Sequence, residues 1–557
     1  MKVLLLITGS AVLLLTSCTS QTPADLVLLN GAIFTADKAN PSAQALAITG
    51  NRITAVGTDD DIEKYVREGI TRVIGLDGRF VVPGFNDAHC HLVSVGAALE
   101  TVNLDGVNRP ERVRELVAER VAGLKPGEPV IGRGWDHTLF PGQQWPTREL
   151  IDDVTQDNPV FLSRVDGHSL LINSYVLKKS GITRETPDPE GGKIVRDPAT
   201  GEPTGVLKEN AMGLAQRSEY GEGDDPETAE RHLRLALELA ASLGVTSVSH
   251  ISRGDERLLE KFAGEGRLTA RISYCPPLPE DQAKLDEYEA LVQKWQAYPT
   301  LRLGFLKDFI DGTLGSATAA LFEPYADDPS TSGVLVEEVE QLQRKVLAAD
   351  KRGFQIGVHA IGTRGNRIVL DAYEKAITVN GRRDSRHRVE HAQILTAPDL
   401  PRFAQIGVIA SMQPTHCITD KRFAELRLGP ERCRYAYAWR SVIAAGGRIA
   451  FGTDAPVEPL DPLEGLYAAV TRKDRAGEEG PGWIPEEKIS MAEALKLYTL
   501  GSAYAEFQEN QKGSITSGKL ADLAVLSRNL LQAAENEIMS TKVDYTVFDG
   551  QVVYSRD

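Results

Sequence analysis

The chain of 557 residues predicts an α/β fold built around a (β/α)8 barrel. Amphipathic helices that end at glycine and lead into short apolar strands recur through its middle, as at 229–248 and 333–358. Repeated units of this kind form parallel sheets, and a long series of them closes into a barrel. The two ends of the chain hold only short strands and turns, which indicates a second, smaller β domain.

The barrel is expected to span residues 81–509. Apolar runs indicate about ten strands between residues 80 and 455, where a (β/α)8 barrel has places for eight. The surplus lies early, so residues 107–228 are interpreted as an insertion after the first barrel strand, with a hairpin at 191–207. The barrel strands are then expected to end near His91, His250, Cys275, Lys307, His359, His391, Gln413 and Asp454.

Residues 26–80 and 510–557 are predicted to form one small β-sandwich domain from both chain ends. Asn30-Gly31, Gly50-Asn51 and Asp549-Gly550 each stand between short apolar runs. Dipeptides of this kind favour tight hairpins, because they accept the positive φ that such turns need. Hairpins are therefore expected at these three places.

The first 18 residues differ in composition from the rest. An apolar run at 3–15 is too short to span a bilayer but fits a signal-peptide core. Leu15-Thr16-Ser17-Cys18 resembles a bacterial lipobox, so residues 1–18 are interpreted as a lipoprotein signal peptide, Cys18 as the lipidated residue and 19–25 as a tether. The alternatives are an ordinary cleaved signal or an N-terminal anchor.

This interpretation predicts a lipid-anchored protein of the cell envelope, on the periplasmic side, and Thr19 favours the outer membrane. The formal net charge is −16, which argues against a nucleic-acid partner. The four cysteines after Cys18 have no paired spacing, so neither a disulfide framework nor a zinc knuckle is expected.

His89 and His91 lie at the end of an apolar run that reads as a buried strand. Side chains two residues apart on a strand point the same way, so the two imidazoles converge on one point. Such a pair suits a divalent metal ion. The alternative is two unrelated polar residues where a strand meets a loop.

Three further strand ends carry a metal ligand or a base, namely His359, His391 and Asp454. Functional groups in such barrels gather at the carboxyl ends of the strands. All five side chains are therefore expected at one mouth of the barrel. Their joint placement favours a metal centre over five separate structural roles.

These residues also carry a resemblance. The order Pro83-Gly84-Phe85-x-Asp87-x-His89-x-His91, then Lys307, His359, His391 and Gly452-Thr453-Asp454, resembles the metal-dependent amidohydrolase superfamily. Finer motifs resemble its YtcJ-like (amidohydrolase 3) branch, which includes N-substituted formamide deformylase. They are Asp166-Gly167-His168-Ser169, Pro203–Asn210, Lys307–Gly312 and Ser411-Met412-Gln413-Pro414, and the resemblance covers about 26–555.

The resemblance implies one metal on His89, His91 and Asp454, and a second on His359 and His391. Lys307 matches the position where many members carry a CO2-modified lysine that bridges two metals. A free ammonium has no lone pair, whereas the carbamate is an anionic ligand. The alternative is an unmodified Lys307 that pairs with Asp308 or Asp311 beside a single metal. Zinc is the expected ion, with manganese or iron as alternatives.

The implied activity is hydrolysis of a non-peptide C–N bond, in an amide, formamide or cyclic amide, by a water that the metal activates. Asp454 is expected to act as general base. His168 is expected to assist catalysis, and Trp135 and Asp136 to line the pocket for a small-molecule substrate. A homodimer is a family-level expectation. The alternatives are hydrolysis of a C–O bond, as in a lactone, and an envelope lipoprotein that only binds a ligand.

Overall fold

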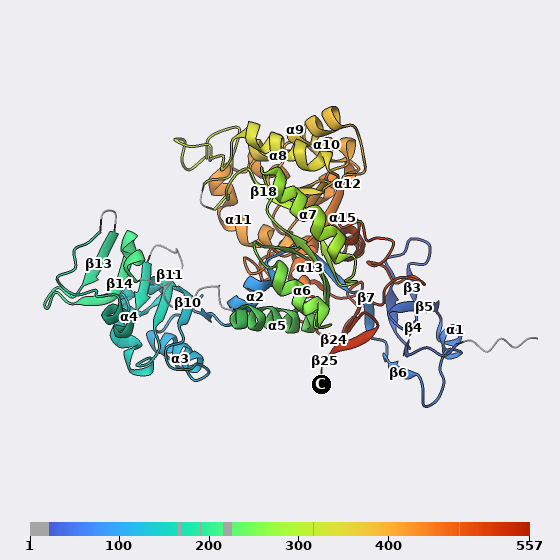
Figure 1. Cartoon of the computed structure of the whole chain (residues 1–557), viewed down its shortest axis with the longest axis horizontal. Helices are drawn as coiled ribbons and strands as arrows, with labels where there is room; N and C mark the ends of the chain where they lie inside the picture. Colours follow the sequence, from blue (N-terminus) through green and yellow to red (C-terminus); the bar gives the residue numbers. More distant parts are fainter. Residues whose placement is uncertain are drawn as a thin grey trace, which may run out of the picture.

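The computed structural model describes residues 22–164, 169–189, 192–215, 226–315, 317–477 and 480–556. Figure 1 shows a central α/β unit with residues 102–209 projecting on its left and strands from both chain ends on its right. Within the described ranges, no helix has the length and apolar character needed to cross a bilayer. Cys18 and His168 lie outside the described residues.

The strands of the central unit run parallel in two sheets, ordered β17-β16-β15-β8 and β18-β19-β20-β21-β22. Most of their side chains are buried, as expected for parallel strands covered on both faces. The bounds are β8 Phe85–Cys90, β15 Val245–Ile251, β16 Arg271–Cys275, β17 Leu301–Leu303, β18 Leu306–Phe309, β19 Ile356–Ala360, β20 Arg388–His391, β21 Ile409–Met412 and β22 Arg448–Phe451.

The fourth predicted barrel strand is divided in two, because β17 pairs with β16 whereas β18 pairs with β19. Gly304 lies at the break, where an added Cβ would stand 2.7 Å from the Cys275 sulfur, so this close approach requires glycine. Beyond the break, the Lys307 N–H donates to the Pro276 carbonyl over 2.8 Å. Lys307 therefore lies where the two sheets meet.

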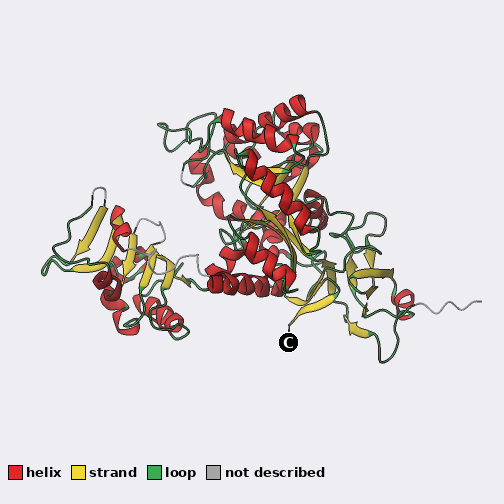
Figure 2. Cartoon of the chain, in the orientation of Figure 1, coloured by secondary structure: helices red, strands yellow, loops and turns green. Residues whose placement is uncertain are grey.

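Helices surround the strands of the central unit (Figure 2). The helix predicted from Gly333 begins only at Val339, because the Val336 N–H bonds to Ile310 and holds this segment against the loop after β18. The bounds are α2 Leu92–Leu99, α5 Pro226–Ser242, α6 Glu256–Gly264, α7 Gln282–Trp295, α8 Val339–Lys351, α9 Thr363–Asn380, α10 Leu400–Ile406, α11 Pro414–Leu428, α12 Trp439–Ala444, α13 Pro462–Thr471, α14 Met491–Lys496 and α15 Ser502–Ala505.

Two further sheets are built from the chain ends. The first, ordered β5-β4-β1-β6, holds strands of the N-terminal part only, and the second, ordered β25-β24-β23-β7-β2-β3, combines strands from both ends. Their inner faces share one hydrophobic core, in which Leu28 and Ile48 of the first sheet lie with Val525 and Val547 of the second. The bounds are β1 Leu26–Leu29, β2 Ala32–Phe34, β3 Ser42–Ala43, β4 Ala45–Thr49, β5 Arg52–Gly57, α1 Asp59–Glu63, β6 Arg72–Gly75, β7 Phe80–Pro83, β23 Leu523–Leu526, β24 Val543–Phe548 and β25 Gln551–Ser555.

Two of the three predicted hairpins are confirmed. Gly50-Asn51 joins β4 to β5, and Asp549-Gly550 joins β24 to β25. The hairpin at Asn30-Gly31 is wrong, because β1 pairs with β4 and β6 while β2 pairs with β3 and β7. Asn30 does adopt a positive φ of 57°, but there the chain passes from one sheet to the other.

Residues 102–209 form a separate sheet, ordered β13-β14-β12-β11-β10-β9. The predicted hairpin at 191–207 is confirmed as the antiparallel pair β13–β14. The bounds are β9 Val102–Asn103, α3 Pro110–Val121, β10 Val130–Trp135, β11 Val160–Arg164, β12 Ser169–Ile172, α4 Ser174–Lys179, β13 Gly192–Arg196 and β14 Pro203–Glu209.

Candidate metal centre

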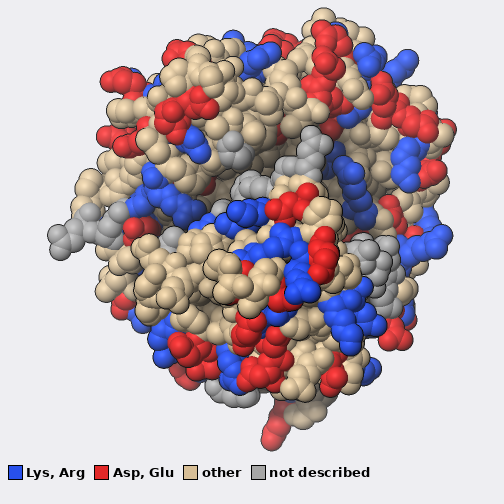
Figure 3. Space-filling view, turned by 90° about the vertical axis from the view of Figure 1, so that its left-hand side faces the viewer, with Lys and Arg blue, Asp and Glu red and all other residues tan. Residues whose placement is uncertain are grey.

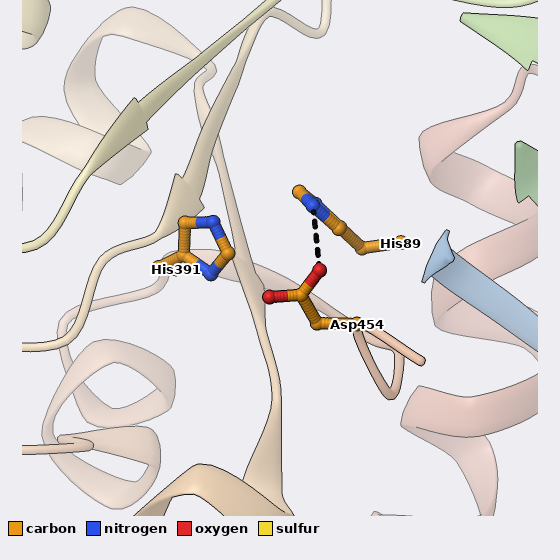
Figure 4. Close-up of side chains that lie close together, drawn as sticks. All are labelled: His89, His391 and Asp454. Atoms are coloured by element: carbon orange, nitrogen blue, oxygen red, sulfur yellow. Dashed lines mark ion pairs between the residues drawn. The ribbon is translucent and has the colours of Figure 1, made fainter. Parts of the chain in front are cut away.

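Three side chains from distant parts of the sequence meet at the carboxyl ends of the central strands. His89 lies on β8, His391 ends β20, and Asp454 follows β22. A ring nitrogen of each histidine and a carboxylate oxygen of Asp454 all lie within 4.8 Å of one another. Figure 4 shows the two rings and the carboxylate arranged around one common space.

Asp87 fixes Asp454 beside His89. Its carboxylate accepts the backbone N–H of His89 and both the N–H and the hydroxyl of Thr453. Gly452 permits this approach, since an added Cβ would lie 2.5 Å from the His89 nitrogen. Burial raises the pKa of Asp87 to about 6. The end of β22 is thereby tied directly to β8.

A buried carboxylate orients His89. Glu390 Oε2 lies 2.5 Å from His89 Nδ1, and the Arg388 guanidinium donates to the other oxygen, Oε1, over 2.6 Å. Burial opposes ionisation of Glu390, but Arg388 and His89 outweigh it and hold its pKa at about 2. The carboxylate therefore takes the Nδ1 proton of His89 and leaves the Nε2 lone pair facing Asp454, 3.4 Å away.

The other histidines repeat this pattern, with one ring nitrogen bonded outward to an acceptor. His91 Nδ1 lies 3.0 Å from the Ile251 carbonyl, and its Nε2 lies 3.1 Å from Asp454 Oδ1. His391 Nδ1 lies 2.8 Å from the side-chain oxygen of Gln413. An imidazole that donates from one nitrogen presents a lone pair at the other. Lone pairs are thus directed into a space that already holds a carboxylate.

His359 joins this group from β19. Its ring centroid lies 4.5 Å from that of His391, and its Nε2 lies 3.1 Å from the Gly312 carbonyl. Asp311 holds the surrounding loops, because its carboxylate accepts three backbone N–H groups, those of Ala320, Ile361 and Gly362. Burial raises the pKa of Asp311 to about 6.

Burial favours the neutral form of three histidines at the site. Burial lowers the pKa of His359 to about 3, lowers that of His391 well below its usual value and also lowers that of His89. Although burial alone would raise it, the surrounding imidazoles hold the pKa of Asp454 well below its usual range. Neutral imidazoles around one carboxylate form a donor set that fits a divalent cation.

The backbone at this mouth is strained at two of the three converging residues. His391 has a φ of 73° and Asp454 a φ of 60°, in the left-handed region that favours glycine. Such conformations cost of order 1–3 kcal/mol each and cluster at functional sites. In both cases the strain turns a side chain at a strand end toward His89.

Lys307 lies beside the histidines but does not point at them. It is buried, its Nζ donates to the Asp308 carbonyl over 3.0 Å, and the same atom lies 3.4 Å from the centre of the Phe309 ring. Burial lowers the pKa of the Lys307 amine to about 8. Asp308 pairs with Lys345 over 2.6 Å, and among the described residues it forms no ion pair with Lys307, although it was one of the two partners considered in the alternative to a carboxylated lysine.

The site opens into a cavity of about 870 Å³. Phe309 and Phe423 give it an apolar side, and Lys421, Arg422 and Arg475 a charged one. Figure 3 shows the face that lies on the left in Figure 1, where Lys and Arg gather across the middle despite the net charge of −16. A cavity of this size that combines apolar and polar walls suits a small molecule.

The predicted pocket residues of the insertion lie elsewhere among the described residues. Trp135 is fully buried in the core of the insertion and donates to the Leu162 carbonyl over 2.7 Å. Asp136 pairs with Arg164 over 3.0 Å. Neither lines the 870 Å³ cavity. His250, at a predicted strand end, bonds to the Leu92 N–H and to Asp255, which makes it a structural residue.

Sequence reasoning missed the residues that hold the ligands in place. Asp87 stands two residues before His89, Glu390 directly before His391, and Asp311 four residues after Lys307. The signal available was that Asp87 shares a strand face with His89. Gln413 was predicted only as the end of a strand, and its role as hydrogen-bond acceptor for His391 was missed.

The α/β fold and the histidine-rich site at the carboxyl ends of its central strands are typical of one class of protein, the metal-dependent hydrolases. A solved structure in this class, an uncharacterized metal-dependent hydrolase from Pyrococcus furiosus, superposes with a TM-score of 0.72 at 29% identity, covering 91% of this chain and 100% of that one. Protein LONG AFTER FAR-RED 3 of Arabidopsis thaliana is 35% identical over 547 residues, 95% of this chain and 92% of that protein. N-substituted formamide deformylase of Arthrobacter pascens is 28% identical over 544 residues, 96% and 98% of the two chains.

Residues 72–554 match the Amidohydrolase family, and the chain belongs to that family. It is therefore an amidohydrolase, an enzyme whose general activity is metal-dependent hydrolysis of C–N bonds in small molecules. The geometry of the mouth agrees with this assignment, since His89, His391 and Asp454 form a group that fits a metal ion.

Proposed function

We propose that the enzyme hydrolyses a non-peptide C–N bond in an amide, formamide or cyclic amide, at a divalent metal held by His89, His391 and Asp454. The observation that carries this proposal is the inward convergence of ring nitrogens on one carboxylate. His91 and His359 complete the donor set. Zinc is the ion that best suits imidazole and carboxylate ligands together.

A bound divalent ion supplies a Lewis acid for the carbonyl and makes water nucleophilic at neutral pH. Asp454 is well placed to move the proton, because its carboxylate borders the cavity and remains ionised. It accepts a proton as the water oxygen attacks the carbonyl carbon, and returns that proton to the nitrogen as the C–N bond breaks. The products are a carboxylic acid and an amine.

A second divalent ion would be held by His359, His391 and a carboxylated Lys307, whose carbamate would supply an anionic ligand. Its support is the position of Lys307 between the two sheets, close to His359 on the neighbouring strand, with which β18 pairs in parallel. In this structure the Lys307 amine donates to the Asp308 carbonyl, a single hydrogen bond of 3.0 Å. Carbon-13 NMR of the protein supplied with labelled bicarbonate at neutral pH tests the modification directly, because the carbamate loses CO2 in acid.

The two central sheets are proposed to belong to one closed (β/α)8 barrel. At one junction Pro277 pairs with Lys307, and at the other the Asp454 N–H donates to the His89 carbonyl over 2.6 Å. Division of strand four into β17 and β18 accounts for nine strands in an eight-stranded plan. Residues 26–80 and 510–557 would form the small sandwich beside it, and 107–228 the insertion.

The enzyme is further proposed to be a lipoprotein of the cell envelope, anchored through Cys18 after removal of the signal peptide. Support comes from the apolar run and the Leu15-Thr16-Ser17-Cys18 motif. Replacing Cys18 by Ser should release the protein from the membrane fraction. His168, which lies outside the described residues, is proposed to assist the reaction.

The decisive assay measures hydrolysis of formamides, N-acyl amino acids and lactones before and after metal removal. Hydrolysis of at least one C–N substrate is expected, lost with a chelator and restored by zinc. Activity on the C–N substrates that persists in fully metal-free protein would contradict the proposed function. Hydrolysis confined to lactones would assign the site to C–O bonds.

A further inference from the structure

One wall of the cavity carries two buried polar atoms without a hydrogen-bond partner among the described residues, His416 Nε2 and Gln393 Oε1. Both side chains are more than nine-tenths buried. Leaving such an atom unpaired costs about 1–3 kcal/mol, so two of them side by side on a cavity wall need an explanation.

The two side chains form one rigid unit. Gln393 Nε2 lies 3.2 Å from His416 Nδ1, so one polar atom of each side chain is engaged in a hydrogen bond between the two. The Gln393 carbonyl accepts the Tyr437 N–H over 2.7 Å, and the His416 N–H bonds to Gln413 in the first turn of α11. Both backbones are therefore fixed, and the free atoms keep their places in the wall.

The unit presents one donor and one acceptor to the cavity. When the Gln393 amide donates to Nδ1, the proton of His416 resides on Nε2 and Gln393 Oε1 remains as an acceptor. When the amide is turned over, Nδ1 donates to the oxygen, Nε2 becomes the acceptor and the amide NH2 the donor. In either orientation, a ligand that satisfies both free atoms must supply one hydrogen-bond acceptor and one hydrogen-bond donor.

The unit borders the reacting atoms. The His416 ring stacks on His391 with centroids 6.0 Å apart, and His416 Nε2 lies 3.8 Å from Asp454 Oδ2. Other histidines of the fold show the contrast, since His250 uses both ring nitrogens in hydrogen bonds. His416 therefore places its unpartnered nitrogen beside the carboxylate of the proposed metal site.

We infer that Gln393 and His416 form a specificity subsite for the CO–NH group of a secondary amide, in which the carbonyl meets the donor and the N–H meets the acceptor. The inference rests on the proposed function and narrows its substrate class to N-monosubstituted amides or formamides and to cyclic amides with a free N–H. N,N-disubstituted amides and esters lack the N–H, so they leave the buried acceptor unpaired.

The test compares three substrates with the same substituent: an N-monosubstituted formamide, its N-methyl derivative and the corresponding formate ester. The quantity measured is the ratio of kcat/KM for the first to that for each of the others, in wild type and in Gln393→Met. The wild-type preference should fall about 10- to 100-fold in the variant, mainly through loss of activity on the N–H substrate. Comparing ratios between proteins cancels the intrinsic reactivity of each substrate.

Gln343→Met is the matched control, because the Gln343 side chain on α8 accepts from Lys375 and does not line the cavity. It should leave all three ratios unchanged. His416→Asn is the second variant should Gln393→Met fail to fold, and it should lower the same preference. Zinc content is measured for every variant and should equal that of wild type.

Two results would overturn the inference while leaving the proposed function intact. One is a substrate preference that neither variant changes. The other is loss of zinc from His416→Asn, which would make His416 a metal ligand. Failure of the wild type to hydrolyse either formamide, together with activity on the ester, would instead contradict the proposed function itself.

Discussion

The two ends of the central strands bury ionisable groups in opposite ways. Below the strands, Glu506 accepts from Asn86, Ser249 and Lys512, and Lys512 also bonds to Ser247. At the mouth, by contrast, ring nitrogens of His89 and His91 face Asp454, and no Lys or Arg forms an ion pair with that carboxylate among the described residues. Both groups are buried, but only the lower one pairs its carboxylate with a positively charged side chain.

This difference separates structure from function within one set of strands. The Glu506–Lys512 pair fixes the packing of α15 against β8 and β15, and it contains its own cation. The group at the mouth needs a cation from outside to pair with its carboxylate. Burial alone therefore does not mark the site, whereas a buried carboxylate that is faced only by ring nitrogens does.

The largest expected effect is that of Asp454→Asn, which removes the proposed proton carrier. We expect kcat to fall by about 10²–10⁴-fold, because general acid–base catalysis is lost while the side-chain shape remains. Steady-state kinetics on a C–N substrate measure it. Asp474→Asn, on the same cavity wall but paired with Lys421, is the control and should retain activity. Equal activity in both variants would rule out Asp454 as the base.

The lower network is tested by Lys512→Met, which leaves Glu506 buried without its cation. We expect the free energy of unfolding to fall by about 3–5 kcal/mol, with zinc content unchanged. Urea denaturation and metal analysis give the two readouts. The double variant Glu506→Gln/Lys512→Met should recover part of the loss. A parallel loss of zinc would show that the two ends are not independent.

A smaller effect is expected for Glu390→Gln, which keeps an oxygen near His89 but removes the charge that orients it. Metal affinity should fall by about 10- to 100-fold, as expected for loss of a carboxylate partner behind a ligand. Competition with a chromogenic chelator measures the Kd. Glu493→Gln, an N-terminal capping residue of α14, is the control. An unchanged Kd for Glu390→Gln would show that the carboxylate does not act through His89.

The smallest effect concerns pH. Although burial would raise it, hydrogen bonds from His387 and Asn380 lower the pKa of Asp350 from 3.8 to about 2. A depressed carboxyl pKa adds stability above the unfolded value, and this stability is lost as pH falls through the folded value. The free energy of unfolding should therefore fall between pH about 4 and about 2, and less steeply in Asp350→Asn. Identical slopes in the two proteins would contradict this.

The sequence predicts which candidate ligands lie together better than it predicts the residues that hold them in place. His89, His91, His359, His391 and Asp454 stand at strand ends, and strand periodicity with parallel-sheet topology brings such residues together. The Gln393–His416 unit was not predicted from the sequence. Its position depends on the turn at the end of β20, where His391 and Ala392 both adopt positive φ values although neither is glycine. Trp135 was predicted to line the pocket but lies in the core of the insertion, and the sequence could not separate the two because an aromatic residue on a strand fits both.

The central claim is that the mouth of the central unit holds a metal ion, and anomalous diffraction from crystals of the zinc-loaded protein tests it most directly. The account predicts a peak at the zinc edge about 2.0–2.2 Å from ring nitrogens of His89 and His391 and from an oxygen of Asp454. A zinc peak bound elsewhere, with these three side chains left as they are here, would contradict it.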